Sequence, residues 1–322
     1  MYEKICLIGG TGRSGTSILA HIFSRHPAVS NISESRFFTD PDGILDFYST
    51  CEVWSPHHYD VKVYRLEHLL KNTVVRHPFY KAFILWRRTG LFRKLLWSVR
   101  PPYFNIGMSE YCPDFIRHTD TLIEQLTEFR YQGNWIGMEQ QHEMRYGNLP
   151  EKKSLAEILR NFLCQVIQSV CEHQQTQYCL EKTPWNILWF DKILELLPEA
   201  KLVHIYRDPR DVVASYRQHA WMPTESEKSA KIYKDLIERW WNIRAGIPPQ
   251  SFLEISLESL VESPQDILRE ICSFWELPWH DTLLEIPLTK AHSGRWQKDL
   301  TAAEQQTVET ILQPQLESMG YV

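Results

Sequence analysis

The stretch ICLIGGTGRSGTS, residues 5–17, decides how the rest of the chain is interpreted. Its first residues form a short apolar run typical of a buried strand, and the apolar residues after position 17 recur with helical spacing. Glycine, serine and threonine lie between the two. Glycines let backbone N–H groups close around an anion without obstruction by Cβ atoms, and a helix N-terminus adds partial positive charge. The stretch therefore predicts a strand, an anion-binding loop and a helix.

The spacing of this loop is close to that of the P-loop of nucleoside triphosphate enzymes. Gly10 and Gly15 are separated by four residues, as in that motif, but Thr16 occupies the position of the phosphate-binding lysine. The cation is instead Arg13, whose planar guanidinium suits one tetrahedral oxyanion. We expect a loop for fewer phosphates that needs no Mg²⁺.

Composition limits the class of protein. The chain has 322 residues and a net charge of −5 without blocks of like charge, which argues against a dedicated nucleic-acid binder. No apolar run approaches membrane-spanning length, and the first expected strand begins near Met1, so we expect a cytoplasmic protein without a membrane span. The seven cysteines show no metal-ligand spacing, which favours reduced, buried thiols and no metal site.

Two α/β regions flank a different middle region. From about residue 40 to 177 the pattern is helical and rich in aromatic residues, and predicts a large helical insertion over a parallel sheet. Strand and helix signals resume at 178–180, are interrupted at 181–184 and continue in a helix at 185–197. We expect one elaborated α/β domain over 1–322, with the 40–177 insertion shaping the acceptor site.

The clearest strand, residues 201–206, leads into a second anion-friendly turn. Asp208 can cap the next helix and Pro209 can take its first position. Arg207 then stands at the strand end and Ser215 in the second helical turn. Residues 34–38 form a third region of interest, where we expect a strand at 37–38 with Glu34 and Arg36 on one side of extended backbone. The pair could be a catalytic base and the residue that orients it, or an ordinary surface ion pair, which the spacing alone favours.

The two turns together resemble the sulfotransferases that use 3′-phosphoadenosine 5′-phosphosulfate (PAPS), and most of all the tyrosylprotein sulfotransferases and their bacterial relatives. The resemblance rests on GRSGTS at 12–17, YRDPRDVVAS at 206–215, ESR at 34–36 and EKTP at 181–184. It implies a P-loop-like parallel sheet flanked by helices. It covers about residues 1–40 and 177–300, and not the insertion.

The resemblance implies a set of functional residues. Residues contacting PAPS would be Gly12, Arg13, Ser14, Gly15, Thr16, Ser17, Arg207, Ser215 and, by a looser match, Arg295 and Lys298. Glu34 would be the catalytic base, Lys182 and Arg13 would act on the transferring group, and Arg36 would lie on the acceptor side. Three histidines are rival bases: His26, His142 and His292.

The implied reaction is transfer of a sulfuryl group from PAPS to an acceptor hydroxyl, by in-line displacement and without a metal. The acceptor stays open among small-molecule, carbohydrate, peptidyl tyrosine, lipid and carrier-bound hydroxyl groups. Two alternatives are an ATP-dependent P-loop phosphotransferase, which Thr16 disfavours, and a non-catalytic nucleotide-binding module.

Overall fold

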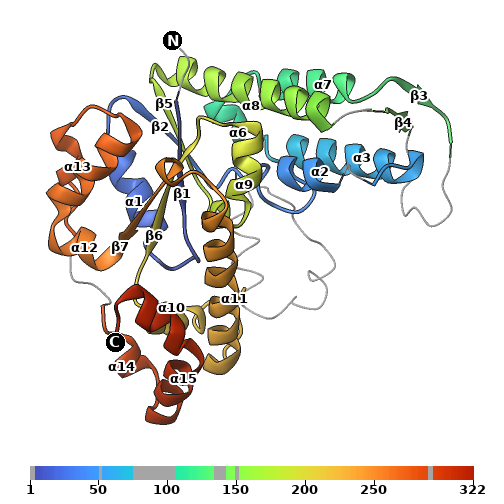
Figure 1. Cartoon of the computed structure of the whole chain (residues 1–322). Helices are drawn as coiled ribbons and strands as arrows, with labels where there is room; N and C mark the ends of the chain where they lie inside the picture. Colours follow the sequence, from blue (N-terminus) through green and yellow to red (C-terminus); the bar gives the residue numbers. More distant parts are fainter. Residues whose placement is uncertain (1–3, 51–52, 75–105, 134–142, 149–151, 289–292) are drawn as a thin grey trace, which may run out of the picture. The chain divides into compact units, whose positions relative to one another are not determined.

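Five parallel strands form the central sheet of the protein, in the order β2-β5-β1-β6-β7 (Figure 1). The computed structural model describes residues 4–50, 53–74, 106–133, 143–148, 152–288 and 293–322. The strands are β1 (Lys4–Gly9), β2 (Val29–Ser33), β5 (Tyr178–Lys182), β6 (Lys201–Tyr206) and β7 (Phe252–Ser256). The predicted parallel sheet is confirmed, and its middle strand is the one that precedes the glycine-rich loop.

The register of neighbouring strands brings the two predicted anion sites to the same edge of the sheet. β1 and β6 are adjacent and parallel, with Ile8 opposite Val203 and Gly9 opposite His204. Both strands therefore end at this edge, β1 at the loop of residues 10–15 and β6 at Arg207. Ligands of open α/β sheets bind at the carboxyl ends of the strands, where these residues lie.

Helices cover both faces of the sheet. One face packs against α1 (Thr16–Phe23), α12 (Leu257–Glu262) and α13 (Pro264–Trp275), through a core that includes Ile8, Leu19, Ile205 and Ile271. The other face carries α10 (Pro209–Tyr216) and α11 (Ser226–Ala245), and α15 (Ala302–Met319) packs against both of these helices (Figure 1). Shorter or connecting elements are α9 (Asn186–Leu196), η1 (Pro249–Ser251), η2 (Asp281–Leu284) and α14 (Trp296–Asp299).

A second compact unit comprises mainly residues 34–176. Its helices are α2 (Ile44–Thr50), α3 (Pro56–Asn72), α6 (Met108–Tyr111), α7 (Phe115–Gln125) and α8 (Lys152–Gln174), and its strands are the antiparallel pair β3 (Phe129–Tyr131) and β4 (Met144–Tyr146). The rings of Phe37, Phe115 and Phe162 pack against one another in its core. In its described residues this segment is helical apart from the short strand pair.

Two local expectations are wrong. Residues 37–38 lie in a turn and not in a strand, because β2 has already ended at Ser33. The segment 181–184 does not interrupt the third strand of the chain's α/β pattern, since β5 continues through Glu181 to Lys182. Both charged residues are buried, at 4% and 3% exposed, and polar partners rather than solvent satisfy Glu181.

The remaining expectations concern cysteines and membrane spans. The six cysteines in the described residues form no disulfide with one another, and five of them are buried. Among the described helices, none has the length and apolar character needed to cross a bilayer.

Candidate functional site

The loop after β1 has the backbone geometry of an anion cradle. Gly12, Arg13 and Gly15 have φ angles of 76°, 59° and 110°, so the chain curls tightly between β1 and α1. Gly15 is the N-cap of α1 and supplies no side-chain acceptor, which leaves N–H groups of the first helical turn for a ligand. A Cβ at Gly15 would lie 2.9 Å from Cδ1 of Ile205, so only glycine fits this position.

Ser14 is the buried residue at the centre of the loop. Its side chain is fully buried, and its hydroxyl has no hydrogen-bond partner among the described residues. A Cβ added to Gly10 would come within 2.3 Å of this hydroxyl and 2.7 Å of the Ile205 carbonyl oxygen. Gly10 is therefore required for close packing of the loop on β6.

The turn after β6 forms as the sequence predicts. The Asp208 carboxylate accepts from the Arg210 backbone N–H at 2.9 Å, and Pro209 is the first residue of α10. Arg207 precedes this cap and is 7% exposed. Its guanidinium forms an ion pair with Asp211 at 3.0 Å, one helical turn away. The helix thus holds the guanidinium at the carboxyl end of β6.

A direct hydrogen bond joins the two predicted anion sites. Nε of Arg13, in the first loop, donates to the Ser215 hydroxyl at 3.2 Å. The Arg207 guanidinium donates to the Arg13 carbonyl oxygen at 3.4 Å. Residues that are about two hundred positions apart in the chain therefore form one polar cluster.

Asp211 ties a third segment to this cluster. One carboxylate oxygen accepts from the Gly294 N–H at 2.9 Å and the other from the Trp296 N–H at 3.0 Å. These bonds fix the backbone on both sides of Arg295, which forms its own ion pair with Asp299. Lys298 is exposed on α14 and has no ion pair in the described part of the chain.

The cluster carries more positive charge than its own carboxylates balance. Burial lowers the pKa of Arg13, and repulsion from Arg207 and Arg295 lowers it further. Burial and the charges of Arg13 and Arg295 likewise lower the pKa of His219. Arg13 contacts no carboxylate among the described residues, so a bound anion would relieve this repulsion.

A cavity of about 300 Å³ opens at the cluster. Its polar wall consists of Arg13, Gly15, Thr16, Ser17 and Arg207, which belong to both predicted anion sites. Its apolar wall includes Leu257 and Val261 of α12 and Leu288. The cavity can therefore hold a molecule with separated anionic groups and an uncharged, largely apolar portion.

Lys182 adds a buried cation next to the loop. It is the last residue of β5, and its Nζ lies 3.5 Å from the Ser17 hydroxyl. The preceding Glu181 accepts hydrogen bonds from the Thr183 hydroxyl at 2.6 Å and the Asn186 amide at 2.7 Å. These contacts anchor the end of β5 and leave the ammonium of Lys182 at the anion cradle. The described residues contain no cluster of three or more His, Cys, Asp or Glu side chains suited to a metal ion.

The comparison with known proteins identifies the family. A profile described as the sulfotransferase family matches residues 89–281, more than half of the chain. The chain belongs to the sulfotransferase family. The matched segment contains Lys182 and the motif from Arg207 to Ser215, and begins after the glycine-rich loop.

Individual relatives of this sulfotransferase are distant. An uncharacterized protein of Aquifex aeolicus is 27% identical over 44% of this chain and 19% of its own length. The omega-hydroxy-beta-dihydromenaquinone-9 sulfotransferase of Mycobacterium bovis is 30% identical over 36% of this chain and 32% of its own length. The chain thus matches less than a third of either relative. A sulfotransferase structure from Mycobacterium avium has a TM-score of 0.48, with 16% identity over 99% of this chain and 77% of that one.

Glu34 and Arg36 of this sulfotransferase form an ion pair, although not in the expected backbone geometry. An Arg36 guanidinium nitrogen lies 3.1 Å from Oε2 of Glu34, and Asp40 lies 3.5 Å from the other side of the guanidinium. The two residues have φ angles of 52° and 65°, so the expectation of extended backbone is wrong. Left-handed conformations are costly for residues with a Cβ and are concentrated at functional sites. The Glu34 side chain is about one-third exposed, at 34%, and can reach solvent.

Of the three histidines named as rival bases, the structure describes His26. His26 uses both ring nitrogens, because Nε2 donates to the Pro278 carbonyl oxygen at 2.8 Å and Nδ1 accepts from the Ala28 N–H at 3.1 Å. Burial also lowers its pKa. These contacts give His26 a role in holding the turn after α1. His142 and His292 lie outside the described residues.

The sequence did not reveal the role of three residues that shape the candidate site. Asp211 joins Arg207 to the 294–296 backbone, Tyr216 donates its buried hydroxyl to the Thr11 carbonyl oxygen, and Trp221 packs on Gly12. The four-residue spacing of Arg207 and Asp211 across the predicted start of a helix could have revealed the ion pair. The other contacts join distant segments and have no local signal.

Proposed function

We propose that this sulfotransferase moves the sulfuryl group of PAPS to an acceptor hydroxyl. The observation that carries the proposal is the single cavity of about 300 Å³ whose polar wall combines the glycine-rich loop with Arg207. One small molecule with anionic groups at two places would contact both. PAPS has this distribution of charge, with a phosphosulfate at one position of the ribose and a phosphate at another.

The residues around the cavity support specific contacts with PAPS. The first-turn N–H groups of α1, with Thr16 and Ser17, would hold the 5′-phosphosulfate. Arg207 and Ser215 would hold the 3′-phosphate, and Arg13, bonded to Ser215, lies between the two anionic positions. Arg295 is fixed near Arg13 by the Asp211 contacts, whereas Lys298 is exposed and does not line the cavity.

The reaction requires a base, an electrophilic centre and a stabilised leaving group. The acceptor oxygen would form a bond to sulfur while the bond from sulfur to the bridging oxygen breaks, releasing adenosine 3′,5′-bisphosphate. Glu34 would accept the hydroxyl proton, a role worth about 10²–10⁴ in rate. Its ion pair with Arg36 would orient the carboxylate on the acceptor side. Lys182 and Arg13 would stabilise charge on the transferring oxygens.

The charge distribution disfavours the two alternatives. An ATP-dependent phosphotransferase needs a lysine where Thr16 stands and a carboxylate free to hold Mg²⁺. Asp211, next to the loop cluster, is instead fully buried and engaged by Arg207, Gly294 and Trp296. A non-catalytic module would have no need for a buried lysine at the cradle, where Lys182 is 3% exposed.

The acceptor and the organisation of the chain belong to this proposal as well. We propose that the 40–177 insertion shapes the acceptor site of a single sulfotransferase domain spanning 1–322. Glu34 and Arg36 belong to the same compact unit as most of the insertion. The acceptor would be a hydroxyl-bearing small molecule, carbohydrate, peptidyl tyrosine or carrier-bound metabolite. The cytoplasmic location stays a prediction from sequence.

Calorimetric titration tests the co-substrate first. The protein is titrated without Mg²⁺ with adenosine 3′,5′-bisphosphate and, separately, with ATP. We expect metal-independent binding of the bisphosphate that Arg207→Ala weakens at least tenfold, since a charge-assisted contact is lost. Arg239→Ala is the matched control, because Arg239 is exposed on α11. Absence of bisphosphate binding, or ATP binding that depends on Mg²⁺, refutes the proposal.

Transfer of radiolabelled sulfate from PAPS then tests the chemistry. A panel of phenols, sugars and tyrosyl peptides identifies an acceptor, and Glu34→Gln is compared with Glu262→Gln, an exposed glutamate of α12. We expect Glu34→Gln to lower kcat about 10²–10⁴-fold with bisphosphate affinity unchanged. Equal rates for the two variants would remove Glu34 from the mechanism.

A further inference from the structure

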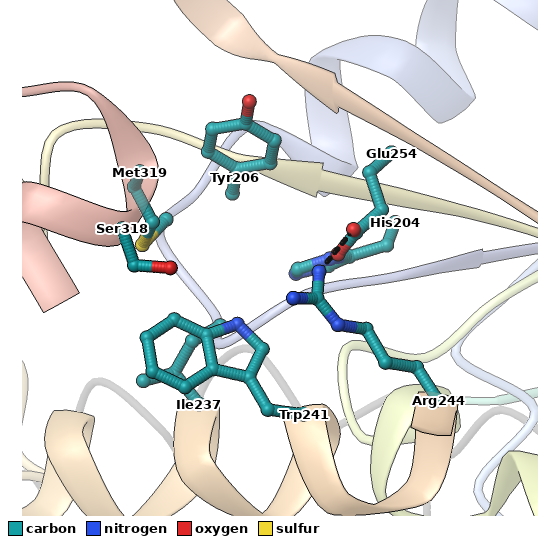
Figure 2. A pocket seen from close by; sticks show the side chains of 8 residues that line it. All are labelled: His204, Tyr206, Ile237, Trp241, Arg244, Glu254, Ser318 and Met319. Carbon is teal, nitrogen blue, oxygen red and sulfur yellow. Dashed lines mark hydrogen bonds and ion pairs between the residues drawn. The ribbon is translucent and has the colours of Figure 1, made fainter. Parts of the chain in front are cut away.

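A second cavity, of about 100 Å³, lies between β6, β7, α11 and the end of α15 (Figure 2). None of its lining residues lines the cavity at the glycine-rich loop. The side chains that line it and carry polar atoms are those of His204, Tyr206, Trp241, Arg244, Glu254 and Ser318. The proposed sulfuryl transfer uses none of these residues.

His204 and Glu254 form a hydrogen-bonded dyad in this cavity, in which the histidine is buried and the glutamate is partly exposed. His204 is 1% exposed, and its Nδ1 lies 2.9 Å from Oε1 of Glu254. The Trp240 indole N–H donates to the same oxygen at 2.7 Å, and the Arg244 guanidinium pairs with the other oxygen. Burial opposes ionisation of Glu254, but the hydrogen bonds from His204 and Trp240 and the charge of Arg244 lower its pKa to about 2.

This dyad determines which His204 nitrogen faces a ligand as an acceptor. An ionised carboxylate only accepts hydrogen bonds, so Nδ1 of His204 must carry the hydrogen between them. In the neutral ring, Nε2 is then a bare acceptor. That nitrogen is buried and has no partner among the described residues. Leaving such an atom unsatisfied is costly, which points to a ligand or water that donates to it.

The surrounding groups restrict what the donor can be. Figure 2 shows the ring of His204, the indole nitrogen of Trp241 and the hydroxyl of Ser318 turned toward the same space. The Trp241 N–H only donates, so the occupant must also accept. An ammonium group cannot accept and would face Arg244, whereas a carboxylate cannot donate to Nε2 and would face Glu254.

A hydroxyl group meets both requirements, because it donates one hydrogen bond and accepts others. The cavity volume of about 100 Å³ equals roughly three waters at about 30 Å³ each, which leaves room for a molecule of a few heavy atoms. We propose that this cavity is a binding site for a short polyhydroxy alcohol, with one hydroxyl between His204 Nε2 and the Trp241 N–H and another at Ser318.

Nuclear magnetic resonance of the full chain tests the proposal directly. Ethylene glycol and glycerol are titrated while the indole N–H signal of Trp241, assigned with Trp241→Phe, is followed. Methylammonium and acetate are titrated as the cationic and anionic probes. We expect saturable shifts of this signal with the diols and triols and none with the two ions. Long-range proton–nitrogen spectra should show His204 as the Nδ1–H tautomer, with its Nε2 signal shifting on binding.

Variants assign the contacts. His204→Asn keeps a donor for Glu254 but removes the Nε2 acceptor, and Ser318→Ala removes an exposed hydroxyl without disturbing the core. Each should weaken binding about two- to tenfold, the effect of one lost hydrogen bond. Ser273→Ala, at an exposed serine of α13, is the matched control and should bind as the wild type does.

Three outcomes would overturn the proposal. Shifts that rise linearly with added alcohol, equally in Ser318→Ala and Ser273→Ala, would mean that the cavity holds water only. Saturable binding of acetate or methylammonium would show that the recognised chemistry is ionic. Retained affinity in both His204→Asn and Ser318→Ala would place the alcohol elsewhere. All of these readouts are independent of PAPS binding.

Discussion

Asp211→Asn should uncouple three segments of the site at once. The Asp211 side chain is fully buried and accepts from the Arg207 guanidinium at 3.0 Å, from Gly294 N–H at 2.9 Å and from Trp296 N–H at 3.0 Å. An amide has the same shape but only one acceptor oxygen. Whichever way the amide is turned, an NH₂ group meets at least one donor, and the charge opposite Arg207 is lost.

The magnitude follows from these contacts. Removing one partner of a buried ion pair costs about 3–5 kcal/mol. Arg207 is itself 7% exposed and cannot recover this energy from solvent. We therefore expect the free energy of unfolding to fall by about 3–5 kcal/mol. The affinity for adenosine 3′,5′-bisphosphate should fall at least tenfold, because both Arg207 and the backbone around Arg295 lose their anchor.

Urea unfolding and calorimetric titration measure the two effects on the same preparations. Asp235→Asn is the matched control, since Asp235 is exposed on α11, and it should change neither quantity measurably. Wild-type stability in Asp211→Asn would refute the reasoning about the buried ion pair. Lower stability with wild-type bisphosphate affinity would refute the coupling of Asp211 to the ligand site.

Three further predictions test the loop, the buried lysine and the edge strand. Gly15→Ala, at φ 110° and with a Cβ 2.9 Å from Ile205, should destabilise the protein by about 1–3 kcal/mol and weaken bisphosphate binding. Gly320→Ala is its control: at φ 77°, with no atom within 4 Å of the added Cβ, it should show conformational strain without loss of bisphosphate binding. Lys182→Met should slow sulfuryl transfer about 10²–10³-fold in single-turnover assays, and an unchanged rate would exclude Lys182 from charge stabilisation. The pKa of Glu254 is about 2 when folded, below its ordinary 4.5, so its contribution to stability is present above pH 4.5 and is lost as pH falls toward 2. In urea unfolding, Glu254→Gln should accordingly be less stable than the wild type at neutral pH. The difference in free energy of unfolding between the two proteins should be smaller near pH 3.

Local sequence patterns were sufficient to predict the elements that hold the candidate site. The apolar run before the glycines, the strand at 201–206 and the Asp208–Pro209 cap depend on neighbours in the chain, and all three form as predicted. The cradle could be predicted because glycine spacing and a helix start are themselves local. The two motifs lie far apart in the chain, but parallel strands joined by helices bring their carboxyl ends to the same edge of the sheet. The two motifs therefore lie close together in the fold.

Other parts of the site could not be predicted, for identifiable reasons. Glu34 and Arg36 adopt left-handed backbone, which a residue with a Cβ adopts rarely and which no periodicity reveals. Glu181 and Lys182 look like a polar interruption, but Thr183, Asn186 and Ser17 provide polar partners within a buried strand. The contacts of Asp211 with residues 294 and 296 join segments more than eighty positions apart.

The adjacency of β2 and β5 determines how easily the segment between these two strands could be exchanged. The two strands pair directly, with Val29 opposite Tyr178, and the 34–176 unit enters the chain between them. The entropy of closing a loop rises only logarithmically with its length, by about 0.6 kcal/mol for each doubling. A crossover of almost any size could therefore be exchanged between Ser33 and Gln177 at little cost to the sheet. Chimaeras that graft a relative's segment at these two junctions should keep the parallel sheet and the glycine-rich loop intact, so that a change of acceptor can be sought by transplantation rather than by point mutation.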